Sequence, residues 1–294
     1  MLSILIPTYN YDCTRLVNDL CRMTRRADIV YEIIVADDAS PMETYREKNR
    51  TINALPHCRF IELPKNVGRA RIRNRLANEA RYEWLLFMDC DAEIIGTTFI
   101  TDYLAQMKTD AEVICGGLCH ADTLPSTEVS LRYAYEKRAD RHRSAHHRGR
   151  SPYKQFSSFN FVIRRKMFQS IRFDERITEY GHEDTLFGIE LSNKNAIIRH
   201  IDNPLLHIGL ESNECFLEKT RAALRNLATM EKNMQGQSSL LKVYNLLHSM
   251  KISRHIGRWF ASKEQSLTAR LMKEKPSVKL FFIYKLGYYC SLKK

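Results

Sequence analysis

Two carboxylates stand one residue apart directly after an apolar run of the sequence. Phe87 and Met88 end this run, and Asp89 and Asp91 follow it with Cys90 between them. Such a pair can hold one Mg²⁺ or Mn²⁺ and leave coordination positions for water and phosphate oxygens. A cation held there would neutralise the charge that grows as a diphosphate leaves. Because Asp-x-Asp is common, a pair of acids that only caps the next helix is the alternative.

A second acidic pair, Asp37 and Asp38, follows another apolar run and precedes Ala39 and Ser40. One carboxylate of this pair can accept a hydrogen bond from a nucleobase or from a ribose hydroxyl. The other can cap a helix or orient a neighbouring side chain. Helix capping alone explains the pair equally well.

The segment that starts at Asn66 and Gly68 opens a helical pattern rich in arginine, including Arg69 and Arg73. Gly68 allows a tight entry turn, and guanidinium groups supply forked donors that suit phosphate. A solvated basic helix face is the alternative. The segment is not a Walker A loop, because it lacks Gly-Lys-Ser/Thr.

Two further sites carry chemistry-bearing side chains in the second half of the sequence. Glu183 and Asp184 precede an apolar helical run, and a carboxylate near a helix N-terminus is an expected position for a general base. His207 ends a short apolar run that begins at Pro204. A capping acid and a structural histidine are the alternatives for these two sites.

The elements that position these side chains alternate between short apolar runs and amphipathic stretches. This alternation predicts βαβ units and an α/β fold with a mainly parallel sheet, in which ligands bind beyond the carboxyl ends of the strands. The strands are predicted at 3–6, 32–36, 59–63, 84–88, 113–118, 159–163 and 196–198. From residue 215 onward the pattern is helical.

The charge of the 294-residue chain is concentrated near its end. The whole chain carries +12, and residues 241–294 hold 12 Lys and Arg but only two acids, a net +10. The near-neutral body and its acid-lined strand ends disfavour a nucleic-acid-binding protein. Eight cysteines without a CxxC pair predict free thiols in a reducing compartment and no zinc site.

The basic residues of 241–294 alternate with aromatic residues such as Trp259 and Phe282. This pattern suits an interfacial helix on an anionic membrane surface, and a helical bundle with solvated lysines is the alternative. No signal peptide is evident, and no apolar run reaches the roughly 18–20 residues of a membrane-spanning helix. We therefore expect a cytoplasmic protein that is peripheral on the inner face of the plasma membrane.

Taken in order, the motifs resemble family 2 glycosyltransferases with the GT-A fold, of the type that builds bacterial cell envelopes or exopolysaccharides. The resemblance covers roughly residues 1–210, and Ala39 replaces the family's usual glycine. The matching positions are Ser3 to Asn10, Asp37 to Ser40, Asn66, Gly68, Arg73, Asn74, Asp89, Asp91, Glu183, Asp184 and His207.

The resemblance implies a catalytic domain at 1–210, with a nucleotide-binding half at 1–118 and an acceptor half at 119–210. A helical basic extension would occupy 211–294. The implied activity is an inverting, hexosyltransferase-like transfer of a sugar, with a UDP-sugar favoured as donor, to a glycan or a lipid-linked glycan.

The resemblance also assigns roles to residues. Asp184 would be the general base, and Glu183 would support it or bind acceptor hydroxyls. A divalent metal, Mn²⁺ or Mg²⁺, and the nucleotide would be held by two sets of residues. These are Asp89, Asp91 and His207 for the metal, and Pro7, Tyr9, Asp37, Asp38, Asn66, Gly68 and Arg73 for the nucleotide.

A nucleotidyltransferase and an inactive scaffold are the alternatives to a glycosyltransferase. A sugar-phosphate nucleotidyltransferase shares the sheet and the metal but usually opens with a glycine-rich phosphate loop, where this chain has Pro7-Thr8-Tyr9-Asn10. A catalytically inactive nucleotide-sugar-binding scaffold is disfavoured because the motif acids are present. The sequence has no Gln-x-x-Arg-Trp motif, so we expect one sugar to be added per acceptor rather than processive synthesis.

Overall fold

The computed structural model describes residues 1–177, 180–234 and 236–293. These residues form two compact units. The described residues of the first unit are 1–119, 142–177 and 183–209. Those of the second unit are 120–141, 180–182 and 210–293.

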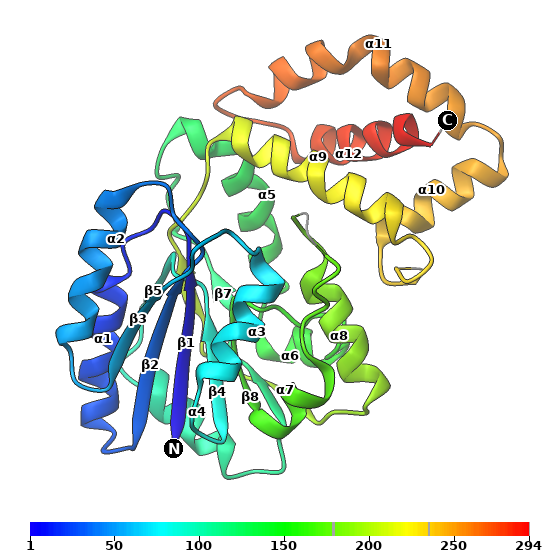
Figure 1. Ribbon diagram of the computed structural model, residues 1–294. Helices are drawn as coiled ribbons and strands as arrows, with labels where there is room; N and C mark the ends of the chain where they lie inside the picture. Colours follow the sequence, from blue (N-terminus) through cyan, green and yellow to red (C-terminus); the bar gives the residue numbers. More distant parts are fainter. Residues whose placement is uncertain (178–179, 235, 294) are drawn as a thin grey trace. The chain divides into compact units, whose positions relative to one another are not determined.

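The first unit is built on a seven-stranded sheet in the order β3-β2-β1-β4-β8-β6-β9 (Figure 1). Strands β1, β2, β3 and β4 run parallel, whereas β8 lies antiparallel between β4 and β6. The strands are β1 Leu2–Thr8, β2 Tyr31–Asp37, β3 Cys58–Glu62, β4 Trp84–Met88, β6 Val113–Cys115, β8 Asn160–Arg164 and β9 Ile198–His200. The predicted α/β fold with a mainly parallel sheet is confirmed.

A second, three-stranded sheet has the order β5-β10-β7. Its strands are β5 Ala92–Ile94, β7 Leu118–Cys119 and β10 Leu205–His207. Strand β10 pairs antiparallel with β5, and His207 lies opposite Ala92. The small sheet thus places His207 beside the segment that follows β4.

Helices cover both faces of the large sheet, which explains why its central strands β1, β2 and β4 read as continuous apolar runs rather than alternating ones. Ile4 and Ile6 pack with residues of α1 and α4, and Leu5 packs on the opposite face with residues of α3, α7 and α8. The helices of this unit are α1 Thr14–Arg26, α2 Glu43–Arg50, α3 Arg69–Glu79, α4 Phe99–Met107, α6 Ala145–Gly149, α7 Arg165–Ile171 and α8 Glu183–Asn193, with a 3₁₀ turn at Thr51–Ala54.

The parallel register aligns the carboxyl ends of the neighbouring strands. Thr8 lies opposite Asp37, which in turn lies opposite Glu62, and Leu5 lies opposite Phe87 in β4. The segments that leave β1, β2 and β4 therefore emerge at one edge of the sheet. The predicted site residues of these three segments share that edge.

Two features of the first unit differ from a plain βαβ pattern. Helix α2 occupies a stretch that reads as merely polar, because only Asn49 of this helix is buried and no apolar stripe marks it. Its charges pair instead, with Arg50 bonded to both Glu43 and Glu62. Strand β8 is antiparallel, a direction that its apolar sequence does not encode.

The second unit is helical in its described residues. It contains α5 Ser130–Asp140, α9 Asn213–Thr229, α10 Ser239–Ser249, α11 Ser253–Leu271 and α12 Val278–Leu292, with a 3₁₀ turn at Thr127–Val129. Among the described residues, no helix has the length and hydropathy needed to span a bilayer. The core of this unit consists of Leu131, Leu217, Phe260, Leu267, Leu271, Phe281 and Tyr284.

Candidate active site

Asp89, the first residue after β4, accepts hydrogen bonds from two guanidinium groups. Its Oδ1 accepts a hydrogen bond from Arg73 at 2.5 Å, and its Oδ2 accepts one from Arg69 at 3.1 Å. Residues four apart on a helix share a face, so α3 presents both arginines toward β4. Arg73 is buried, and its guanidinium stands 5.7 Å from the centre of the Phe173 ring. The carboxylate and the arginines thus hold one another in place.

Arg69 also reaches the start of α8. Its Nε lies 3.0 Å from Oε1 of Glu183, a buried residue in the first turn of that helix. One guanidinium therefore joins the acid after β4 to the acid at the N-terminus of α8. These two acids are 94 positions apart in the sequence, and the structure brings them to one place.

Asp91 and His207 meet where β5 and β10 pair. His207 Nε2 lies 3.2 Å from Asp91 Oδ2, and the backbone N–H of Ile208 donates to the carbonyl of Asp91 at 3.0 Å. The His207 ring also packs against Phe159, with 5.2 Å between ring centres. Two of the three predicted metal ligands are therefore adjacent, and the backbone holds them there.

Gly209 makes room for the Asp91 carboxylate. A Cβ atom at position 209 would lie 2.3 Å from Asp91 Oδ2 and 2.4 Å from its Cβ. Real Cβ atoms do not approach other atoms so closely, so a larger residue at 209 would displace Asp91. Position 209 therefore requires glycine, because the Asp91 carboxylate occupies the space of a Cβ atom.

We therefore expect Gly209→Ala to weaken divalent-metal-dependent nucleotide binding by about 10-fold or more, because it displaces the Asp91 carboxylate from the position in which it would bind the metal. The measurement is calorimetric titration of UDP with and without Mn²⁺. Gly96→Ala is the matched control, because a Cβ at Gly96 meets nothing within 4 Å. Equal Mn²⁺ dependence in the Gly209→Ala variant and the wild type would contradict the assigned role of this glycine.

The donor set at Asp91 and His207 fits a divalent cation. A carboxylate oxygen and an imidazole nitrogen together suit Mn²⁺, and the carboxylate alone suits Mg²⁺. Asp89 differs, because each of its oxygens already accepts from an arginine. The structure thus brings together Asp91 and His207 and directs Asp89 toward α3.

Asp184, in the first turn of α8, has a carboxyl group in which one oxygen accepts a hydrogen bond from the described residues and the other does not. Its Oδ2 accepts from the backbone N–H of Ser158 at 3.1 Å. Its Oδ1 is buried and accepts no hydrogen bond from any described residue. Burial and the neighbouring Glu183 raise the pKa of Asp184 to about 6, although Arg73 and the Ser158 bond act in the opposite direction. A carboxyl with a pKa near neutrality and an unused oxygen is suited to accepting a proton.

Ser158 and Phe159, which precede β8, contact Asp184, Asp89 and His207. Neither residue was predicted from the sequence. The Phe159 carbonyl accepts from the N–H of Asp89 at 3.1 Å, and Ser158 donates to Asp184. Phe159 also contacts His207 through its ring. The only sequence signal was their place at the start of an apolar run, since backbone groups leave no residue-type signature.

The acidic pair at the end of β2 is bonded to backbone. Asp37 accepts from the N–H and from the hydroxyl of Ser40, the N–H bond being 2.8 Å long. Asp38 accepts from the N–H of Val67 at 2.7 Å and from that of Gly68 at 2.9 Å. Burial raises the pKa of Asp38 above its ordinary value. Asp37 thus shapes its own turn, and Asp38 fixes the loop that leads into α3.

The remaining predicted nucleotide-binding residues lie around this loop. Pro7 is half-buried at the end of β1, Tyr9 is 50% exposed, and Asn66 is exposed. Gly68, the residue before α3, has φ +86°, a conformation that favours glycine. Exposed Tyr9 and Asn66 flank backbone that Asp37 and Asp38 hold in shape.

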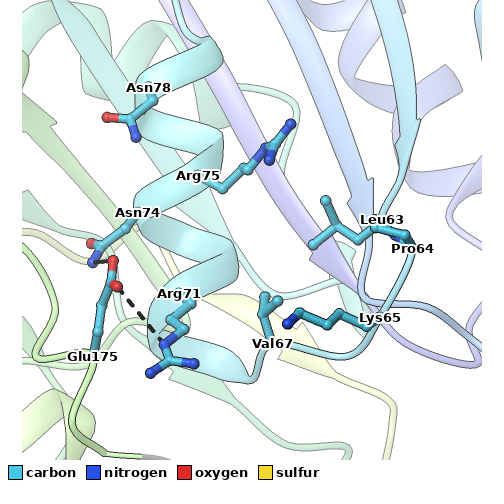
Figure 2. Close-up of a pocket in the computed structure, with 9 residues that line it drawn as sticks. All are labelled: Leu63, Pro64, Lys65, Val67, Arg71, Asn74, Arg75, Asn78 and Glu175. Atoms are coloured by element: carbon cyan, nitrogen blue, oxygen red, sulfur yellow. Dashed lines mark hydrogen bonds and ion pairs between the residues drawn. The ribbon is translucent and has the colours of Figure 1, made fainter.

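A pocket of about 280 Å³ lies beside α3 and is distinct from this cluster (Figure 2). Arg71 points toward Glu175 in this pocket, in contrast to Arg69 and Arg73, which contact Asp89. The pocket contains none of the predicted metal ligands or acids. Its lining consists of Leu63, Pro64, Lys65, Val67, Arg71, Asn74, Arg75, Asn78 and Glu175.

The sheet and the helices around it resemble those of solved glycosyltransferases with the GT-A fold. The mannosyltransferase PcManGT from Pyrobaculum calidifontis, solved with GDP-Man and Mn²⁺, aligns with a TM-score of 0.56 at 13% identity, over 99% of this chain and 86% of that one. TarS 1–349 of S. aureus, solved with UDP, aligns with a TM-score of 0.53 at 19% identity, over 99% and 90%. At these identities the likeness concerns the fold alone.

The family follows from the sequence comparison. Residues 3–172 match the model of glycosyl transferase family 2, which is more than half of the chain, and the chain belongs to that family. It is a glycosyltransferase, so the predicted fold, family and enzyme class are confirmed.

Two curated relatives are chondroitin synthases. The one from Escherichia coli is 25% identical over 241 residues, which are 70% of this chain and 34% of that protein. The one from Pasteurella multocida (strain Pm70) is 24% identical over 70% of this chain and 24% of that protein. The chain therefore spans about a third and about a quarter of the lengths of these relatives.

Proposed function

We propose that this glycosyltransferase moves a sugar from a nucleoside diphosphate to an acceptor hydroxyl with inversion at the anomeric carbon. The observation that carries the proposal is the convergence of Asp89 and Glu183 on Arg69, with Asp184 next to Glu183. This arrangement gathers phosphate-binding cations and a proton acceptor from β4, α3 and α8 of one unit.

Asp184 accepts the proton in this mechanism. The acceptor hydroxyl loses its proton to the buried Oδ1 of Asp184 as its oxygen bonds to the anomeric carbon. The bond between that carbon and the diphosphate oxygen breaks in the same displacement, and the nucleoside diphosphate departs with the electron pair. A single carboxylate on the side opposite the leaving group is what one inverting displacement requires.

Arg69 faces the departing diphosphate in this proposal, and the buried Arg73 holds Asp89 beside it. Guanidinium forks bind phosphate oxygens well, and Asp89 orients both of them. A divalent cation held by Asp91 and His207 would supply further neutralisation of the diphosphate charge when it is bound. Asp89 was also predicted as a metal ligand, but its contacts favour a role in positioning the arginines.

The nucleotide would lie at the shared strand edge, against Pro7, Tyr9 and Asn66. Asp37, Asp38 and Gly68 would shape the backbone beneath it, as their hydrogen bonds and conformation support. We favour a UDP-sugar as donor, because TarS has been solved with UDP-GlcNAc and with UDP, although PcManGT was solved with GDP-Man.

For the acceptor, we propose a glycan or a lipid-linked glycan that receives one sugar per encounter. The division proposed from the sequence is a catalytic domain at 1–210, with its acceptor half at 119–210, and an extension at 211–294. We place the protein at the cytoplasmic face of a membrane through residues 241–294, with Mn²⁺ or Mg²⁺ as its metal. Eight free thiols agree with a reducing compartment.

A screen of nucleotide sugars for slow donor hydrolysis tests the proposed function. We expect Mn²⁺-dependent release of a nucleoside diphosphate from one UDP-sugar, with slower release from GDP-sugars. The readout is coupled detection of the free diphosphate, with EDTA as control. Formation of pyrophosphate from a nucleoside triphosphate and a sugar phosphate would instead identify a nucleotidyltransferase. Absence of both reactions, together with absence of UDP and GDP binding, would overturn the proposal.

A further inference from the structure

Exposed apolar side chains gather on two consecutive helices of the helical unit, α10 and α11. Val243, Leu246 and Met250 follow one another at spacings of three and four, so they form one stripe along α10. Leu246 is 62% exposed and Met250 is 60% exposed. Single exposed apolar residues are ordinary, but several on one helix face indicate a surface that binds another protein or a membrane.

Two further exposed apolar residues belong to α11 and the turn before it. Ile252 and Trp259, seven positions apart, lie on one side of that helix, and both are exposed. The turn between the two helices is tight and ordered by hydrogen bonds. Lys251 has φ +60°, its N–H donates to His248, and the N–H of Ile252 donates to Leu247. This is the bonding of a helix-ending Schellman turn, so α10 and α11 form a defined bend (Figure 1).

Cations occur in the same stretch of sequence as these apolar residues, and acids are absent from it. Between residues 240 and 263 the sequence has five Lys and Arg and no Asp or Glu. Within the described parts of the chain, none of these five cations forms an ion pair. They are Lys242, Lys251, Arg254, Arg258 and Lys263.

Several basic residues on the other helices of this unit have partners. Arg221 pairs with Glu218 and Glu264, and Lys293 pairs with Glu231. Lys285 lies over the rings of Tyr135, Phe281 and Phe282 in the same unit. Of the aromatic residues of α12, Phe281 and Tyr289 are buried, whereas Phe282 is 47% exposed. Lys273, Lys275 and Lys279 are exposed too and form no ion pair among the described residues, but Glu274 lies among them. The cations of α10 and α11 differ because they lie in an acid-free stretch beside exposed apolar residues.

We propose that this bend, the α10–α11 surface, is the part of the chain that inserts into an anionic lipid bilayer. Aliphatic and Trp side chains would enter the boundary between headgroups and acyl chains, and the five cations would contact lipid phosphates. A bilayer is the proposed occupant because it offers an apolar layer directly beneath anionic headgroups, which matches apolar side chains beside unpaired cations. The proposal rests on the membrane placement suggested above and not on the transfer chemistry.

The test is flotation of the full chain with two kinds of vesicle, pure phosphatidylcholine and an equimolar mixture with phosphatidylglycerol. We expect the wild type to float only with the anionic vesicles. The double variant Lys251→Gln/Arg254→Gln should bind these vesicles roughly 30-fold more weakly, because it loses two surface cations. Leu246→Ser/Met250→Ser should also lose binding, since both apolar side chains enter the bilayer.

Matched controls remove the same kinds of side chain elsewhere. Lys273→Gln/Lys279→Gln removes two exposed cations of the same unit, and Ile197→Ser removes an exposed apolar residue of the first unit. Both controls should float like the wild type. Equal loss in the controls, or unchanged flotation of the α10–α11 variants, would overturn the proposal.

The two proposals fail separately. Flotation needs no nucleotide, and donor hydrolysis is measured without vesicles. Variants of the α10–α11 surface should keep wild-type donor hydrolysis in solution, which also shows that they are folded. Binding of the wild type to an acidic protein or polymer but to neither vesicle would contradict the lipid assignment and leave the transfer chemistry unaffected.

Discussion

Replacement of Asp184 by Asn should leave UDP binding near the wild-type level and lower the rate of sugar transfer by about 1,000-fold. The amide keeps the shape of the side chain but cannot accept the proton, and a positioned base contributes roughly 10²–10⁴-fold. Transfer is measured with the donor found in the hydrolysis screen, and UDP affinity is measured by calorimetry.

Two variants on the same helix serve as comparisons for Asp184→Asn. Glu190→Gln alters an exposed acid of α8 and should keep full activity. Glu183→Gln removes the charge that pairs with Arg69 and should lower the rate of sugar transfer by about 10-fold. The effect is smaller because this change alters the position of Arg69 and leaves the proton acceptor in place. An Asp184→Asn variant with wild-type transfer would end the general-base assignment.

The pH profile gives an independent measure of the same group. Asp184 must be deprotonated to act as a base, and its pKa is raised to about 6. The rate should therefore rise with pH, reach half of its maximum near pH 6 and level off above about pH 7. At pH 5 it should be about 10-fold below the plateau. The titration belongs to the pair formed with Glu183, so Glu183→Gln should shift the midpoint to lower pH.

Replacement of Asp91 by Asn, or of His207 by Ala, should abolish the dependence of UDP binding on Mn²⁺. Each change removes one of the two adjacent donors, and we expect the Mn²⁺-dependent gain in affinity to fall by about 100-fold. Calorimetric titration of UDP with Mn²⁺ and with EDTA measures this gain. Asp102→Asn, a change in the first turn of α4, is the control that should retain it.

Asp89→Asn gives a different expected result and separates the two acids of the motif. Asp89 holds Arg69 and Arg73, so its loss should weaken UDP binding both with Mn²⁺ and with EDTA. Loss confined to the Mn²⁺ condition would instead make Asp89 a metal ligand, as the sequence analysis predicted. Unchanged Mn²⁺ dependence in Asp91→Asn would contradict the assignment of Asp91.

The sequence predicted the fold well because the central strands of the first unit are buried on both faces. Burial on both faces requires continuous apolar runs, and such runs mark β1, β2 and β4, whereas the edge strand β3 alternates buried and partly exposed residues. The acids that follow such runs are visible for the same reason. Strand direction leaves no trace in composition, so the antiparallel β8 could not be inferred from its residues.

The contacts that assemble the site were less predictable. Arg69 stood out only as one arginine among several on α3, and its bond to Glu183 depends on how α8 packs. Ser158 and Phe159 act through backbone groups, which every residue type possesses. Gly209 is needed only because Asp91 lies against it, and that contact depends on the pairing of β5 with β10. Such contacts arise from tertiary structure, which local sequence patterns do not encode.

The guanidinium shared between Asp89 and Glu183 bears on the order in which the two substrates enter. Under the proposed mechanism, an incoming diphosphate draws Arg69 toward itself, because two phosphate groups attract a cation more strongly than one carboxylate does. Glu183 then loses its ion pair with Arg69, and its carboxylate can accept from hydroxyl groups of the second substrate. The donor would thus have to enter before the acceptor, and the empty protein would have little affinity for the glycan alone.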